Sequence, residues 1–256
     1  EKKSFAKGDL ITWQGPHDYN ELRHYTGLSW AERKDGSRLS MTEKEEGVVV
    51  PSTDFSGLWK RSDFDPATGK AKFNPHYKPP KNWPLTELGQ EMVDNFHEDQ
   101  NPMVSCGNPG PPKAMIVPYP VMISRPNDKT IIFERELMRD VRVIHLDHSV
   151  KREEPSKLGH SLGWFEGNSL IISTDNFVDD LWGSHTGINS SDKKQLTEKF
   201  TLSENGTYLI AEITINDPVY LTKPHTFFHR WKKIADREVI QAPCTMESAK
   251  LYLQGG

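Results

Sequence analysis

Alternating apolar and polar positions dominate the second half of the chain and predict β-strands. Within residues 195–203, Leu196, Glu198, Phe200 and Leu202 fall on one face, and Thr or Lys fills the positions between them. The run 208–216 follows Asn205-Gly206, a pair that favours a tight hairpin turn. Further strands are predicted over residues 54–61, 114–124, 130–135, 138–146, 227–233 and 238–242.

A second hairpin is predicted around Glu166-Gly167-Asn168, because Gly and Asn accept positive φ at little cost. Its arms, 162–165 and 169–174, are apolar and rich in β-forming residues. His160 stands at the entry to the first arm, either hydrogen-bonded to a neighbouring strand or lining a cavity. With this hairpin, the pattern predicts a mainly β fold, an antiparallel barrel of eight or nine strands that is closed or nearly closed.

One helix is predicted over residues 84–96, with Thr86 as its N-cap and Glu87 in its first turn. Its apolar residues recur every three or four positions, so they form one face that is expected to plug or buttress the barrel: Leu85, Leu88, Met92 and Phe96. Residues 1–50 hold short strand-like runs, a predicted turn at 34–37 and a charged connector. We interpret 1–50 as a small β subdomain, or the tail of a larger domain, and 51–256 as the barrel domain.

The charge and composition of the chain limit the classes of partner that it is expected to bind. The 256 residues carry a net charge of −4 without a basic stripe, which argues against a nucleic-acid partner. No apolar run reaches the roughly 20 residues that a membrane-spanning helix needs. The Pro-rich segments 62–83 and 101–113 are predicted loops, and they are candidate docking segments for another protein or a second copy of the chain.

The two cysteines, Cys106 and Cys244, lie in polar stretches beside Pro or Gly. Exported proteins place disulfides in such loops, and neither spacing resembles a zinc or redox motif. We therefore predict a Cys106–Cys244 disulfide, with two unrelated buried thiols as the alternative. The bond indicates a periplasmic or secreted protein whose signal peptide has been removed.

Five motifs resemble a large family of exported bacterial proteins without a settled activity. They are Pro-Leu-Thr-Glu-Leu-Gly at 84–89, Cys-Gly-Asn-Pro-Gly at 106–110, Pro-Tyr-Pro at 118–120, the run 159–170 and Ile-Asn-Asp-Pro at 215–218. Many members carry Gly-His-Ser-Ile-Gly-Arg-Trp-Glu-Gly-Asp-Thr-Leu at the place of 159–170. The resemblance spans about residues 50–250 and implies a periplasmic or secreted lipocalin-like barrel; residues 1–40 resemble the end of a small β domain that often accompanies the family.

Gly57-Leu58-Trp59 resembles the start of lipocalin-like barrels, where the Trp closes the barrel floor under an Arg from a late strand. Arg230 is the candidate for that Arg. The chain departs from the family at three polar positions, with Ser173 for a usual Asp, Asn-Ser-Ser at 189–191 for Pro-His-Ser, and Gln195 for a His. A family acid–base or metal site would therefore be depleted here, although His160 and Glu198 are retained.

Glu198 shares its strand face with apolar residues, and a buried carboxylate needs a partner or a raised pKa. It either forms an ion pair with Arg142, Arg230 or another barrel arginine, or it is a pocket acid beside His160. The histidines are not spaced as metal ligands, so no cofactor is expected. A copper or zinc ion held by His160 and His185 is a minor alternative.

Three functions follow from these features. The first is binding of an apolar or aromatic small molecule inside the barrel, with Trp164, Trp182, Tyr119, Arg230 and His185 as lining. The second is a cofactor-independent hydratase, isomerase or hydrolase in which His160 and Glu198 exchange a proton. The third is a structural or assembly protein with a degenerate pocket.

Overall fold

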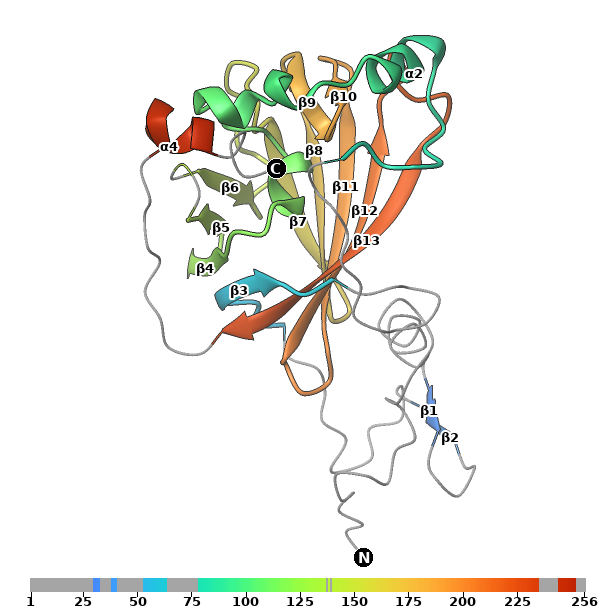
Figure 1. Ribbon diagram of the computed structural model, residues 1–256. Coiled ribbons are helices and arrows are strands. Elements are labelled where there is room, and N and C mark those ends of the chain that lie inside the picture. The colour runs from blue at the N-terminus through green and yellow to red at the C-terminus, as the bar shows by residue number, and fades with distance from the viewer. Residues whose placement is uncertain are drawn as a thin grey trace, which may run out of the picture.

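A computed structural model describes residues 30–32, 38–40, 53–63, 78–136, 138, 140–234 and 244–251. Within these ranges nine strands close into a barrel in the order β11–β12–β13–β3–β4–β5–β6–β7–β8, and β8 pairs back onto β11 (Figure 1). The mainly β fold and the closed barrel are confirmed. The barrel strands are β3 (Gly57–Arg61), β4 (Val121–Asn127), β5 (Thr130–Arg135), β6 (Val141–His145), β7 (His160–Glu166), β8 (Ser169–Asp175), β11 (Gln195–Leu202), β12 (Tyr208–Asn216) and β13 (His225–Ile234).

One strand pair corrects the expectation of a wholly antiparallel barrel. β6 and β7 run in parallel, with Ile144 opposite Ser161 and His145 opposite Leu162. The cause is the connection between them, residues 146–159, which returns the chain to the end where β6 began. Parallel neighbours need a crossover of about this length, whereas a hairpin turn makes antiparallel ones.

The two ends of the barrel differ. At one end lie α2 (Glu87–Asp94) and the hairpin of β9 (Asp180–His185) and β10 (Ile188–Ser190), which the sequence reading missed (Figure 1). The opposite end carries the turns β4–β5, β7–β8 and β11–β12. The remaining short helices are η1 (Glu98–Gln100), η2 (Pro102–Ser105), α3 (Lys113–Ile116) and α4 (Met246–Leu251).

The strand expected over residues 114–124 is wrong in its first half. Residues 113–116 form the buried helix α3, and β4 begins only at Val121. Pro118 and Pro120 stand between the two elements, and a proline has no N–H to donate to a β-ladder. The apolar run alone does not distinguish a buried short helix from a strand.

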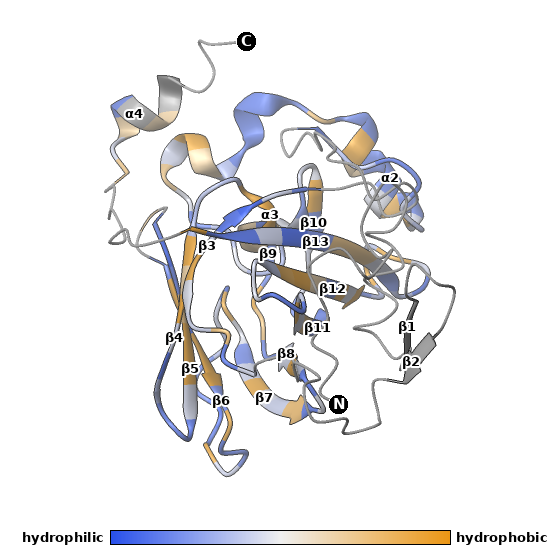
Figure 2. Cartoon of the chain, turned by 90° about the horizontal axis from the view of Figure 1, so that it is seen from below, coloured by the Kyte–Doolittle hydropathy of each residue, from blue (hydrophilic) through white to orange (hydrophobic). Residues whose placement is uncertain are grey.

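Apolar side chains fill the barrel interior, and the hydrophobic colour lies mainly on strands such as β4, β5 and β12 (Figure 2). Trp59 is fully buried, and its Nε1 donates to the carbonyl of Phe55 at 2.9 Å. The cation over its ring is Lys233, whose Nζ lies 5.4 Å from the centroid. This corrects the expectation for Arg230, because odd-numbered positions of β13 face inward and Arg230 faces outward.

Helix α2 starts as predicted, with the Thr86 hydroxyl accepting from the Gly89 backbone N–H at 3.1 Å. Its contact with the barrel matches the prediction only in part. The helix approaches through Gly89, where an added Cβ would lie 2.5 Å from the Tyr220 carbonyl oxygen, whereas Leu88 is 41% exposed. Leu85 packs against the barrel core and so buttresses it, whereas Leu88 and Met92 border a surface groove. The predicted face therefore does not plug the barrel.

The predicted disulfide is present between Cys106 and Cys244, with Cα atoms 5.7 Å apart. Cys106 caps η2, and Cys244 lies just before α4, so the bond holds these two helices together. At the other end of the chain, β1 (Trp30–Glu32) and β2 (Arg38–Ser40) pair antiparallel on either side of the predicted turn, which itself lies outside the described residues. The strand predicted over 238–242 and most of the loop 62–83 also lie outside them.

Candidate functional site

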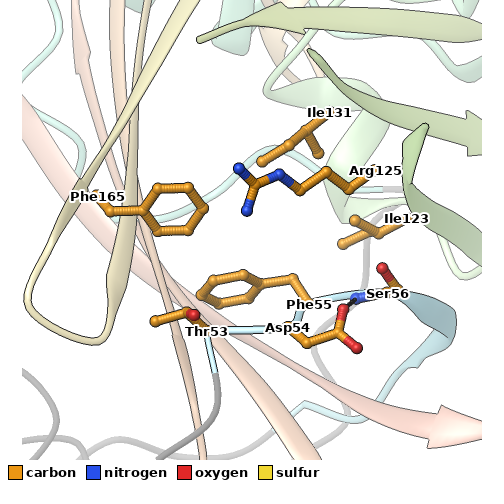
Figure 3. Close-up of a pocket in the computed structure, with 8 residues that line it drawn as sticks. All are labelled: Thr53, Asp54, Phe55, Ser56, Ile123, Arg125, Ile131 and Phe165. Atoms are coloured by element: carbon orange, nitrogen blue, oxygen red, sulfur yellow. Dashed lines mark hydrogen bonds between the residues drawn. The ribbon is translucent and has the colours of Figure 1, made fainter. Parts of the chain in front are cut away.

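A hollow of about 290 Å³ opens at the barrel end that carries the β4–β5 and β7–β8 turns, and we call it the mouth pocket (Figure 3). Its floor is apolar and its rim is polar. Phe55, Ile123 and Ile131 are buried, whereas Thr53, Asp54 and Arg125 are exposed. The full lining is Thr53, Asp54, Phe55, Ser56, Ile123, Arg125, Ile131 and Phe165.

Strand alternation places the walls of the mouth pocket. Ile123 of β4 and Ile131 of β5 are inward positions, each 2% exposed. Phe165 follows Ser161 and Gly163 on the inner face of β7, at the last inward position before the turn. Residues far apart in sequence therefore meet because their strands end at the same rim.

The segment before β3 forms the remaining wall. Asp54 accepts a hydrogen bond from the Ser56 backbone N–H at 2.9 Å, and hydrogen bonds from Ser56 lower the pKa of this carboxyl. This turn presents Phe55 to Phe165, and the two rings stack with centroids 6.3 Å apart and an interplanar angle of 28°. Arg125 lies over the Phe165 ring, with its Cζ 5.4 Å from the centroid. The pocket thus combines an apolar base, two aromatic rings and one guanidinium group.

The opposite end of the barrel is closed by buried polar groups. Lys194 donates to the Pro111 carbonyl at 2.9 Å and to the Ser190 hydroxyl at 3.1 Å, and its Nζ lies 4.0 Å from the centroid of Phe177. Burial lowers its pKa to about 7. Lys113, whose pKa burial also lowers to about 7, donates to the Thr186 hydroxyl. These contacts connect α3 and its preceding loop to the β9–β10 hairpin.

Glu198 is fully buried and forms the ion pair that was one of its two interpretations. Arg142 Nη1 donates to its Oε1 at 3.1 Å, and Nη2 donates to its Oε2 at 2.5 Å. The same guanidinium donates to the hydroxyls of Ser161 at 3.0 Å and Thr174 at 2.7 Å. This layer crosses the barrel interior with its charges matched and with each nitrogen of the guanidinium hydrogen-bonded.

His160 lies on the other side of the barrel wall. Ser161 faces inward, so its neighbour His160 faces outward, where its ring stacks on His145 with centroids 5.3 Å apart. Burial and then the charge of His145 lower the pKa of His160. The structure therefore does not bring His160 to Glu198, and the acid–base hypothesis lacks the contact that proton transfer needs.

The five residues expected to line a ligand cavity are dispersed over the molecule. Trp164 is on the outer face of β7, where its Nε1 donates to Glu166 at 2.7 Å, and Tyr119 is 42% exposed. Arg230 is also outside, 4.6 Å above the Tyr208 ring.

His185 is buried at the closed end, 5.3 Å from Trp83 between ring centroids. Its Nδ1 accepts from the Thr186 backbone N–H, and burial holds its pKa well below the usual range. His185 is therefore neutral and lies at a different place from His160. Within the described ranges, no three His, Cys, Asp or Glu side chains are grouped to hold a metal ion.

Trp182 borders a second hollow of about 540 Å³, which we call the hairpin groove. The groove runs between α2 and the β9–β10 hairpin, and the Trp182 ring stacks on Phe96 with centroids 5.2 Å apart. Its lining is Leu88, Glu91, Met92, Asn95, Gln100, Leu181, Trp182, Gly187 and Asn189.

The sequence reading missed the residues of the mouth pocket. Alternation along the strand, which placed Glu198 on an inward face, also places Phe165 on the same face as Gly163, because the two residues are two positions apart. Alternation does not place Arg125, because the β4–β5 register shifts between Ser124 and Asn127. Where such a shift falls, alternation no longer tells which side a residue faces.

No family model and no curated protein matches the sequence. A crystal structure of a mutant of the fluorescent protein UnaG is similar at 14% identity over 71% of this chain and 97% of that chain, with a TM-score of 0.35. Similarity at this level carries no argument about what this chain binds. Among the described residues, no helix has the length and apolar character to cross a bilayer.

Proposed function

We propose that this barrel binds a small apolar or aromatic molecule in the mouth pocket. The observation that carries the proposal is the hollow itself, whose buried apolar floor lies beside two stacked phenylalanine rings at an open barrel end. Small-molecule sites are concave and combine apolar walls with polar groups that orient the ligand. In the mouth pocket four apolar residues form the floor and walls, and four polar residues form the rim.

The volume limits the size of the ligand. At about 290 Å³ the pocket lies just below the range for ligand sites, which is roughly 300–1,000 Å³. A molecule of one or two fused rings suits this space. Deeper insertion is blocked, because Phe133, Phe200 and Trp231 fill the interior behind the pocket and are buried to 2% exposure or less.

Isothermal titration with 2-naphthamide, a neutral two-ring probe, tests the proposal. Phe165→Ala should weaken binding by about 10- to 150-fold, because it removes an aromatic wall worth roughly 1.5–3 kcal/mol. Trp164→Ala is the matched control, since it removes the neighbouring aromatic residue from the outer face and should leave binding unchanged. Absence of saturable binding, or equal losses in both variants, would refute the mouth pocket as the site.

We further propose that the protein is exported. The Cys106–Cys244 disulfide supports this location, because such bonds persist mainly in oxidising compartments. Mass spectrometry after alkylation of free thiols in fractionated cells tests the location. The proposal requires the oxidised protein in the periplasmic or extracellular fraction, and a reduced protein confined to the cytoplasm would contradict it.

A further inference from the structure

Arg125 differs from the other arginines of the barrel wall in how few protein acceptors it meets. Within the described residues its guanidinium lies over the Phe165 ring and 3.7 Å from one carboxylate oxygen of Asp128, and its charge also acts on Asp54. That distance is beyond normal hydrogen-bond range, and the Asp128 side chain is fully exposed, so this pair holds the guanidinium weakly. By contrast, Arg142 makes four side-chain hydrogen bonds.

The guanidinium of Arg125 lies against the pocket, above the apolar floor and beside the Phe165 ring (Figure 3). Its side chain is 41% exposed, so its N–H groups remain accessible. A guanidinium offers five N–H donors in a planar fork, which matches a carboxylate through two parallel hydrogen bonds. Arg125 therefore offers N–H donors to an anion at the edge of an aromatic site.

The other charged groups near the pocket either interact with neighbouring protein groups or face solvent. Asp54 on the opposite wall accepts from Ser56, and the charges of Lys233 and Arg125 act on it. Lys233 lies over the buried ring of Trp59. Asp128 points to solvent. Of the two cations, Arg125 is the one that lines the hollow.

From this arrangement we infer that the mouth pocket selects aromatic carboxylates, with the ring against Phe55 and Phe165 and the carboxylate on Arg125. The inference rests on the proposed binding function and narrows its ligand class. The attraction is partly electrostatic at a solvent-exposed rim, so added salt should weaken it.

A matched pair of probes, 2-naphthoate and 2-naphthamide, tests the inference by titration calorimetry. The two share one ring system and differ in charge at one group. We expect wild-type protein to bind naphthoate about tenfold more tightly than naphthamide at low salt, as a single charge-assisted pair gives. The preference should shrink as salt rises from about 50 to about 500 mM, where screening is strong.

Arg125→Met should abolish the preference, so that naphthoate and naphthamide bind with equal affinity, and Arg125→Lys should keep part of the preference. Arg152→Met is the matched control, because that exposed arginine pairs with Asp175 on the outer surface. Equal affinities of wild-type protein for both probes, or equal losses for both in Arg125→Met, would overturn the inference and leave the binding function standing. Failure of both probes to bind would overturn the binding function and the inference together.

Discussion

The buried ion pair of Arg142 and Glu198 permits a quantitative prediction. Glu198 is fully buried, and within the described residues its carboxylate receives hydrogen bonds from Arg142 alone. Arg142→Met leaves that carboxylate buried and unpaired, and Glu198→Gln leaves the guanidinium without its counter-charge. Removing one partner of a buried pair costs about 3–5 kcal/mol, so each single variant should lose that much unfolding free energy.

The double variant, Arg142→Met with Glu198→Gln, should lose far less than the sum of the two. It holds no buried charge, and the Ser161 and Thr174 hydroxyls remain hydrogen-bonded to each other at 2.9 Å. The remaining cost is the poorly paired amide, about 1–3 kcal/mol. Two singles of 3–5 kcal/mol and a double of this size give a coupling energy of several kcal/mol.

Urea unfolding followed by tryptophan fluorescence measures all four proteins, and the chain has seven tryptophans as reporters. Additive losses in the double variant, or single losses below about 1 kcal/mol, would refute the reasoning, because either result means that the pair is not buried as a unit. Each variant that remains folded should bind 2-naphthamide normally, since the layer is not part of the mouth pocket.

Three further predictions concern stability. Reduction of the Cys106–Cys244 bond, which closes a loop across 138 positions, should lower the melting temperature by several degrees in calorimetry. Such bonds contribute about 2–5 kcal/mol to the unfolding free energy. An unchanged melting temperature, with reduction confirmed by mass, would contradict this. The pKa of Lys194 is about 7 when folded and near 10.5 when unfolded, so the unfolded chain binds more protons between these values and urea stability should rise from pH 7 to 9.5. If the unfolding free energy of Lys194→Met rises with pH as steeply as that of wild type, the lowered pKa of Lys194 is not the cause of the rise. Gly163→Ala should lower the unfolding free energy by about 1–3 kcal/mol in the same assay, because the added Cβ lies 2.6 Å from the Ile144 Cγ2 methyl. An unchanged unfolding free energy would contradict this and would mean that β6 shifts to make room for the Cβ.

Most of the barrel strands and two of the hairpins were determined by local sequence. Alternation along 195–202 placed Glu198 among inward apolar residues, and the Gly167-Asn168 and Asn205-Gly206 pairs located two turns correctly. The N-cap of α2 and the disulfide were also readable, because capping and loop chemistry depend on a few neighbouring residues. Closure into a barrel followed from the number of strands that had to be paired.

The candidate site was decided by tertiary structure. Strand alternation tells which side of a strand a residue faces, but not which other strands end at the same rim, so it did not bring Phe55, Arg125 and Phe165 together. It also left the partner of Glu198 open, because Arg142 and Arg230 were equally plausible until closure of the barrel put Arg142 inside and Arg230 outside. Non-local closure determines which side chains share a cavity, and a single sequence read locally does not contain that information.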